Sequence, residues 1–196
     1  LTVIDPHLKW QLRRKLKQVH HELKLTLIYV THDQVEALTF AQQVVVMTRG
    51  RAVQMGIASE LFERPRHTFV GNFIGSPGMN FLPARGTGSG IEVAGRILPA
   101  SNAELGRLDR FTLGVRPEYV RLSDSQDAGA VPAVVSQAQD IGTYWLVTAR
   151  LGAQADAPLL RARLGPDETV PQVGQPVWLQ VVGEHTCYYL NEELIA

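Results

Sequence analysis

The sequence has a single cysteine, no long apolar run and no excess of charge of either sign. Cys187 has no second cysteine to pair with in this chain, which fits a reducing compartment. No apolar run approaches the roughly 20 residues needed to span a bilayer, and the first residues show no signal-peptide pattern. Lys plus Arg and Asp plus Glu both total 19, so overall charge gives no argument for a nucleic-acid or anionic-membrane partner.

Several catalytic patterns are also absent. The chain contains no GxxxxGK[ST] phosphate loop, no HExxH zinc motif and no cysteine cluster, and no Ser/His/Asp set can be assigned. The first residues read LTVIDP without an initiator Met, so we expect the chain to be part of a longer protein.

Composition and punctuation predict two domains. The 196 residues are 45% apolar and 19% charged, as in ordinary soluble globular proteins. Gly75, Ser76, Pro77 and Gly78 interrupt the chain where helical patterns give way to short β-like runs. We therefore expect one domain over residues 1–75 and a second over residues 76–196.

The first of these domains has an α/β pattern. Asp5-Pro6 is a good helix start, and a stripe of apolar residues at spacings of three and four follows as far as Leu23. Near-continuous apolarity over 25–31 predicts a strand buried on both faces, as in a parallel sheet. The remaining predictions are a helix over 33–42, a strand over 44–47 with a hairpin to 52–55, and short helices over 59–63 and 67–73.

The second domain reads as all-β. Many short strands separated by turn signals, without a convincing long helix, predict a small barrel or sandwich that resembles an OB fold. The predicted strands are 91–93, 111–115, 133–135, 144–151, 159–164 and 177–182. The only strong cations in residues 84–196 are arginines, and they form no basic run, so nucleic-acid binding is disfavoured.

His32 is the first candidate site residue, because it stands where the predicted strand ends and the next helix begins. Ligands of open parallel sheets are usually bound at this edge, where an imidazole could bind a phosphate oxygen or orient a water. The structural alternative is a histidine that caps or packs, and the position alone does not decide between them. A metal pair of His32 with Glu36 lacks a third ligand nearby, so no metal site is expected.

Three other stretches are open to two interpretations. Asp5 is fully explained as a helix cap. The glycine-rich stretch 86–90 lacks the Lys-Ser/Thr of a phosphate loop, so we interpret it as a hairpin tip. Arg116, Pro117 and Glu118 follow a predicted strand and could form either a ligand-facing corner or a surface ion pair of small energy.

Four stretches, in order, resemble one family. LTVIDPHLKWQLRRKL resembles the D-loop and following helix of ABC-transporter ATPase subunits, and TLIYVTHDQVEALTFAQQVVVMTRGRAVQMG resembles their switch-histidine region. SELFERPRHTFVGNFIGSPGMNFLPA resembles the end of the ATPase domain in importers of sugars, polyols and glycerol phosphate. LGVRPEYVRL resembles the Arg-Pro-Glu signature of that subfamily's C-terminal regulatory TOBE domain, which is built from OB-like β modules.

The resemblance assigns roles to the candidate residues. His32 matches the switch histidine, which contacts the γ-phosphate of ATP and helps to position water. Asp5 matches the D-loop aspartate, which communicates across a dimer of ATPase subunits. Arg116, Pro117 and Glu118 match the regulatory signature. Val3 and Ile4 depart from the usual small-or-polar-Leu pattern of the D-loop, which leaves the details of coupling across the dimer open.

The resemblance also implies an activity, partners and a location. The fold class is the incomplete C-terminal portion of an ABC ATPase domain followed by an OB-like TOBE domain. The intact protein would use ATP and Mg²⁺ to power uptake of a small polar solute, with a second ATPase subunit and membrane permease subunits, at the inner face of the membrane. This chain lacks the phosphate loop, the signature motif and the Walker-B acidic pair, so it is expected to be inactive alone. The alternative is a regulatory, ligand-binding β module, and the sequence names neither its ligand nor the solute.

Overall fold

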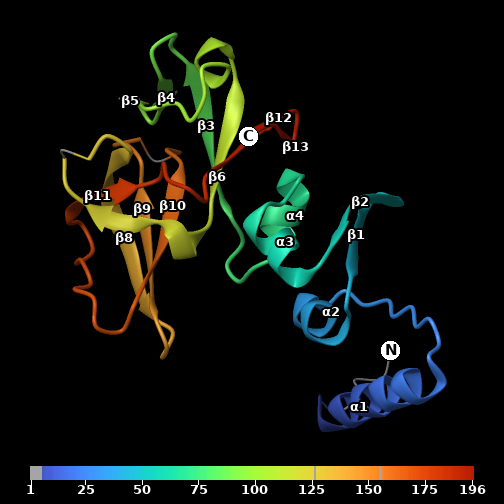
Figure 1. Ribbon diagram of the computed structural model, residues 1–196. Coiled ribbons are helices and arrows are strands. Elements are labelled where there is room, and N and C mark those ends of the chain that lie inside the picture. Colours follow the sequence, from blue (N-terminus) through green and yellow to red (C-terminus); the bar gives the residue numbers. More distant parts are fainter. Residues whose placement is uncertain (1–5, 126, 155) are drawn as a thin grey trace. The chain divides into compact units, whose positions relative to one another are not determined.

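A computed structural model describes residues 6–125, 127–154 and 156–196. The chain divides into two compact units, an N-terminal unit (Leu1–Val44) and a C-terminal unit (Val45–Ala196) (Figure 1). Helices make up the regular structure described in the first unit, whereas most of the second consists of strands. This order of elements confirms the predicted fold class, a small α/β region followed by antiparallel β sheets.

The N-terminal unit contains two helices at the positions that the sequence predicts. Helix α1 spans Pro6–Leu23 and helix α2 spans Gln34–Phe40. The apolar stripe of α1 remains open to solvent, because Leu8 and Leu12 are both more than half exposed. The periodicity therefore predicted the helix correctly, whereas none of the residues described around this stripe covers it.

The predicted strand over residues 25–31 is wrong. The structure assigns no strand to this segment, and Ile28 and Val30 are highly exposed. An isolated extended segment has no partner for its ladder hydrogen bonds, and no described strand pairs with this one. The apolar residues of the segment are typical of a strand covered on both faces. Their pattern does not show whether neighbouring strands are present to pair with it.

The C-terminal unit begins with a small helix-and-strand region. Strands β1 (Val44–Thr48) and β2 (Arg51–Gly56) form a two-stranded sheet, which confirms the predicted hairpin. Arg49 and Gly50 both have positive φ in its tight turn, a conformation that glycine adopts at least cost. Two short helices of six residues each follow, α3 at Ala58–Glu63 and α4 at Thr68–Phe73.

Two antiparallel sheets form the rest of this unit. The six-stranded sheet has the order β13-β12-β6-β3-β4-β5, and the five-stranded sheet has the order β10-β9-β8-β11-β7 (Figure 1). Two 3₁₀ turns, η1 (Leu105–Arg107) and η2 (Pro117–Tyr119), connect strands. The strand bounds are β3 Asn80–Gly86, β4 Ile91–Val93, β5 Arg96–Leu98, β6 Phe111–Val115, β7 Arg121–Ser123, β8 Ala130–Asp140, β9 Trp145–Arg150, β10 Leu159–Leu164, β11 Pro176–Gln180, β12 Cys187–Leu190 and β13 Glu193–Leu194.

Every strand predicted in the second domain exists, and five strands were not predicted. β4, β6 and β10 have the predicted bounds, while β8 extends well beyond the predicted residues 133–135 at both ends. The hairpin between β3 and β4, in which Gly86 pairs with Ile91, confirms the interpretation of the glycine-rich stretch as a hairpin tip. The unpredicted strands are either very short or contain proline or charged residues; they are β3, β5, β7, β12 and β13.

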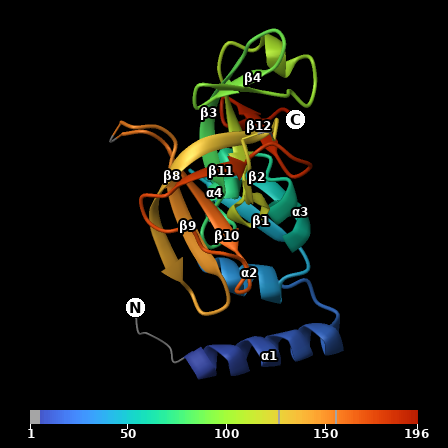
Figure 2. The same cartoon turned by 90° about the vertical axis from the view of Figure 1, so that its left-hand side faces the viewer.

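A large hydrophobic core lies between the two sheets. Leu82 and Leu113 from the six-stranded sheet and Leu160 and Leu179 from the five-stranded sheet belong to the same buried cluster. Figure 2 shows β8, β9 and β10 as neighbouring arrows of the second sheet, as their pairing requires. Burial of this much apolar surface between two faces makes the core the main stabilising feature of the C-terminal unit.

Asn80 adds a polar connection between the sheets. Its side-chain amide donates to the carbonyl oxygen of Arg161 and accepts from the amide of Arg161, both at 2.9 Å. Asn80 is buried at the start of β3, and Arg161 lies on β10, the edge strand of the other sheet. The amide therefore occupies backbone groups that an edge strand would otherwise leave unpaired.

Candidate functional site

His32 lies immediately before helix α2, and its side chain is exposed. The next residue, Asp33, is the N-cap: one of its carboxylate oxygens accepts from the amides of Val35 at 2.8 Å and Glu36 at 3.1 Å. The amide of Asp33 in turn donates to the hydroxyl of Thr31 at 3.0 Å. Because Asp33 performs the capping, the imidazole of His32 is presented to solvent at the end of a short, locally ordered turn.

Glu36 organises the N-terminal unit. Its buried carboxylate lies 3.0 Å from a guanidinium nitrogen of Arg13 and accepts hydrogen bonds from the hydroxyls of Thr31 and Tyr29. Lys9 adds a second cation at 3.9 Å. Since these groups already use the carboxylate oxygens of Glu36, the residue is poorly placed to ligate a metal with His32. No group of three or more metal-ligating side chains occurs among the residues that the structure describes.

Asp5, the predicted D-loop aspartate, lies outside the described residues. Its expected role therefore rests on the sequence resemblance alone.

Arg116 is the most deeply buried charged side chain of the C-terminal unit, with 1% of its surface exposed. Its guanidinium donates to the carbonyl oxygens of Phe62 at 2.5 Å, Ile74 at 2.5 Å and Leu61 at 3.4 Å. It also lies 3.9 Å from the centre of the Phe62 ring. The ligand-facing corner and the surface ion pair that the sequence left open are both wrong for this side chain, which points into the protein.

The contacts of Arg116 have a clear physical reason. Leu61 and Phe62 lie in the last turn of α3, and Ile74 is the C-cap of α4, so the guanidinium satisfies carbonyl groups at the C-terminal ends of both helices. Burial lowers the pKa of the Arg116 guanidinium, and the carbonyl dipoles offset the cost of removing its charge from water. Gly75 permits the approach, because a Cβ there would lie 2.8 Å from Nη1 of Arg116.

Pro117 and Glu118 have different surroundings. Pro117 is buried at the first position of η2, where its fixed φ suits the turn. The carboxylate of Glu118 lies 3.6 Å from the guanidinium of Arg163 on β10, and that guanidinium stacks over the ring of Tyr144 at 3.9 Å. The three residues of the signature therefore have separate structural roles. Arg116 binds the C-terminal ends of α3 and α4, Pro117 begins the turn η2, and Glu118 contacts the five-stranded sheet.

A second set of contacts, centred on Glu63, was not identified from the sequence. One oxygen of Glu63 accepts a 2.6 Å hydrogen bond from the hydroxyl of Tyr119, and the other lies 3.1 Å from Nδ1 of His185. The rings of Tyr119 and His185 stack 3.9 Å apart. Burial and the hydrogen bond to Glu63 raise the pKa of Tyr119 to about 12. Only the adjacency of Tyr119 to the Arg-Pro-Glu signature could have drawn attention to this set.

The segment from α3 to α4 is also fixed by strand β12 and the chain end. The hydroxyl of Tyr189 donates to the carbonyl oxygen of Pro65 at 2.9 Å, and the amide of Leu194 donates to the carbonyl oxygen of Arg66 at 2.9 Å. Burial raises the pKa of the Cys187 thiol, whose sulfur lies 3.8 Å from the carbonyl oxygen of Glu63. Helices α3 and α4 are thus joined to the β sheets by hydrogen bonds distant in sequence.

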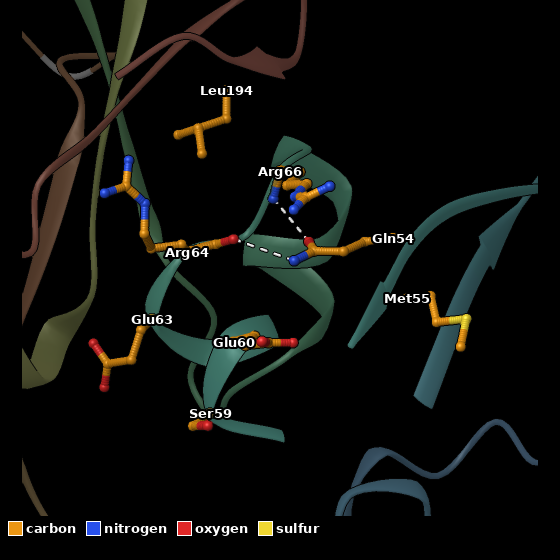
Figure 3. A pocket seen from close by; sticks show the side chains of 8 residues that line it. All are labelled: Gln54, Met55, Ser59, Glu60, Glu63, Arg64, Arg66 and Leu194. Carbon is orange, nitrogen blue, oxygen red and sulfur yellow. Dashed lines mark hydrogen bonds between the residues drawn. The ribbon is translucent and has the colours of Figure 1, made fainter. Parts of the chain in front are cut away.

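A cleft of about 390 Å³ opens beside this joint (Figure 3). The amide group of Gln54 is directed at the backbone, donating to the carbonyl oxygen of Arg64 at 3.2 Å and accepting from the amide of Arg66 at 2.7 Å. Figure 3 places Met55 on the neighbouring strand, away from the helix that carries Glu60 and Glu63. With carboxylates and guanidiniums on the same short segment, the cleft has no dominant sign of charge.

The chemistry of these sites differs between the units. His32 is an exposed group that could transfer or share a proton, whereas Arg116 and Glu63 are held by contacts within the protein and contribute to its architecture. Among the described residues, no helix is long and apolar enough to cross a bilayer. The structure brings together the regulatory-signature residues and the helices that precede them. Within residues 6–44, none of the contacts described joins His32 to a second catalytic group.

Comparisons with known proteins find a family model that includes the Arg-Pro-Glu signature, and relatives that match most of the chain. A family model, the TOBE domain, matches residues 113–188. The sn-glycerol-3-phosphate import ATP-binding protein UgpC of Escherichia coli (strain K12) is 42% identical over 185 residues, which cover 92% of this chain and 50% of that protein. The corresponding protein of Shigella sonnei (strain Ss046) is 41% identical over the same shares. The chain spans about half the length of the curated relatives it matches.

A solved structure was also found. It is the cytoplasmic molybdate-binding protein ModG with molybdate bound, which covers 57% of this chain and 95% of its own at 11% identity, with a TM-score of 0.45. A likeness of that size supports no conclusion about this chain.

Proposed function

Because this chain belongs to the ATP-binding subunits of ABC importers of the sugar, polyol and glycerol-phosphate subfamily, as their C-terminal part with the TOBE domain, we propose that the intact protein hydrolyses ATP to drive uptake of a small polar solute. The observation that carries this proposal is the 42% identity, over 92% of the chain, to ATP-binding proteins of sn-glycerol-3-phosphate import. The solute would be a sugar, a polyol such as glycerol, or glycerol phosphate.

His32 is the residue of this chain that acts on ATP in the proposal. Its imidazole contacts the γ-phosphate and orients the attacking water. The exposed position of His32 before α2 supports this role, because the side chain is not used in capping. Asp5 serves communication between two ATPase subunits. Mg²⁺ would neutralise charge on the phosphates, with ligands from the phosphate loop and acidic pair that precede the D-loop in this family.

The partners in the proposal are a second ATPase subunit and integral membrane permease subunits, which place the protein at the inner face of the membrane. Residues 1–75 form the end of the ATPase domain and residues 76–196 the regulatory domain. The contacts of Arg116 link the two proposed domains, since they join a residue of the proposed regulatory domain to the helix ends of the proposed ATPase domain. A movement of one domain would therefore displace the residues of the other that contact it.

The second candidate is a regulatory, ligand-binding β module without ATPase activity. It is favoured by the completeness of the core in the C-terminal unit compared with the exposed N-terminal unit. Under this alternative His32 and Asp5 have no catalytic duty. The two candidates make opposite predictions for a histidine substitution in the intact protein.

The test is ATP turnover by the intact subunit reconstituted with its permease subunits in vesicles. His32→Ala is expected to lower the turnover rate by roughly 10²–10⁴-fold, the usual contribution of a positioned proton-transfer group. His21→Ala, an exposed histidine on α1, is the matched control and should leave the rate unchanged. The 196-residue chain alone should neither bind ATP tightly nor hydrolyse it. Full turnover by the His32→Ala protein would favour the binding-module alternative.

A further inference from the structure

The imidazole of His32 is not fixed by contacts of its own. It is exposed before α2, and none of the hydrogen bonds or ion pairs described within residues 6–44 involves it. Its location therefore depends on the backbone of the turn formed by Thr31, His32 and Asp33. A group that orients an attacking water must be held within a fraction of an ångström, so the contacts that fix this turn bear on the proposed hydrolysis of ATP.

Thr31 closes this turn on its N-terminal side. Its hydroxyl oxygen accepts from the amide of Asp33 at 3.0 Å, across the backbone of His32, and the same hydroxyl donates to Oε2 of Glu36 at 2.9 Å. One hydroxyl group therefore links the residue that follows His32 to a carboxylate in the first turn of α2. A valine in place of Thr31 could make neither hydrogen bond, whereas a serine could make both.

Glu36 connects the turn to helix α1. Its Oε1 lies 3.0 Å from Nη1 of Arg13 and 3.9 Å from Nζ of Lys9. Its Oε2 accepts from the hydroxyls of Thr31 at 2.9 Å and Tyr29 at 3.2 Å. The residue is only 8% exposed, and both of its oxygens have partners. A buried carboxylate held in this way has little freedom to move, so it also fixes the hydroxyl of Thr31.

We propose that Glu36 and Thr31 are positioning residues for His32, which act through the backbone of the turn and do not contact ATP. Helix α1 anchors Glu36 through two of its cations, so it contributes to the same support. In place of the metal pair considered from the sequence, Glu36 is joined to the His32 turn by the hydroxyl of Thr31. This inference rests on the proposed ATPase function, because it assigns both residues to that reaction.

The test is release of radiolabelled phosphate from ATP by the intact subunit, reconstituted with its permease subunits in vesicles. Thr31→Val nearly keeps the shape of the side chain but removes its hydroxyl, and it should lower kcat about tenfold with the KM for ATP unchanged. Thr31→Ser retains the hydroxyl and should restore kcat to within about twofold of the unsubstituted protein. Glu36→Ala should lower kcat by up to about 10²-fold, the cost of a misplaced reacting group.

Thr39→Val is the matched control, because the hydroxyl of Thr39 lies on the same helix and donates to backbone carbonyl oxygens there, that of Val35 at 2.6 Å and that of Glu36 at 3.5 Å. It removes a hydroxyl one turn further along α2 and should leave kcat unchanged. A double substitution separates positioning from general structural support. In the His32→Ala protein, Glu36→Ala should lower turnover by less than about twofold more, because the group that it positions is already absent.

Hydrogen exchange on the 196-residue chain, measured by NMR, tests the geometry without ATP. Thr31→Val should speed exchange of the Asp33 amide about tenfold, whereas Thr39→Val should not alter it, and helical circular dichroism shows whether each variant is folded.

The inference is overturned by a full rate of turnover in Thr31→Val, by an equal loss in Thr39→Val, or by effects of Glu36→Ala and His32→Ala that simply multiply. A full rate in His32→Ala would overturn the proposed function as well. Loss of turnover in His32→Ala together with a full rate in Thr31→Val would overturn this inference alone.

Discussion

The two units of this chain contain similar apolar side chains and use them very differently. Leu12 in α1 is 53% exposed, whereas Leu113 in β6 is fully buried between two sheets. The N-terminal unit is held by polar contacts around Glu36, while the C-terminal unit has a large hydrophobic core formed by strands of two sheets. Apolar content therefore does not measure stability. What counts is whether the partners of each apolar face are present.

The same leucine-to-alanine substitution in each unit measures this difference and has the largest expected effect. Leu113→Ala should lower the free energy of unfolding of the C-terminal unit by about 2–5 kcal/mol, because it leaves a cavity in a packed core. Leu12→Ala should change stability by less than about 0.5 kcal/mol, since its side chain loses little buried surface. Urea unfolding followed by the emission of Trp145 and Trp178 reports on the first, and helical circular dichroism on the second. Equal losses for the two variants would contradict the comparison.

A buried cation sharpens the comparison within the C-terminal unit. Arg116→Met should cost about 2–4 kcal/mol, because it leaves buried carbonyl oxygens at the ends of α3 and α4 without donors. The exposed Arg161 on β10 provides the control, since Arg161→Met removes a charge without removing buried contacts. Hydrogen exchange should show faster opening of residues 58–74 in the Arg116 variant and no change in the control. An unchanged exchange rate there would show that these helices are held by other contacts.

The smallest expected effect is a dependence of stability on alkaline pH. The pKa of Tyr119 is raised to about 12 in the folded protein, against about 10 in an unfolded chain. The protonated phenol is therefore favoured by folding, so its contribution is complete below about pH 10 and is lost as the pH rises toward 12. Tyr119→Phe should flatten the decline in unfolding midpoint over this window. Tyr144→Phe, a ring on the five-stranded sheet, is the control and should retain the full decline.

The sequence predicted local structure best where a pattern depends only on neighbours along the chain. The stripe of α1 and the hairpin around Gly50 are such patterns, and both were found at the predicted positions. The strand expected over residues 25–31 failed because strand formation needs a second strand, which periodicity cannot provide. β3 was missed because it contains a proline and an arginine, which are unusual in a strand. β12 was missed because it is a buried run of only four residues.

The same distinction between local pattern and long-range contact applies to the candidate site residues. The sequence by itself determined which residues to examine, since His32 follows from its position before a helix and Arg116 from its place in a motif. Only the tertiary structure decided what they do with their surroundings: Arg116 turns inward to carbonyl groups 42 to 55 residues away, and Glu63 meets Tyr119 across 56 residues. Sequence patterns record local preference, whereas burial and long-range hydrogen bonds depend on which distant segments the fold brings together.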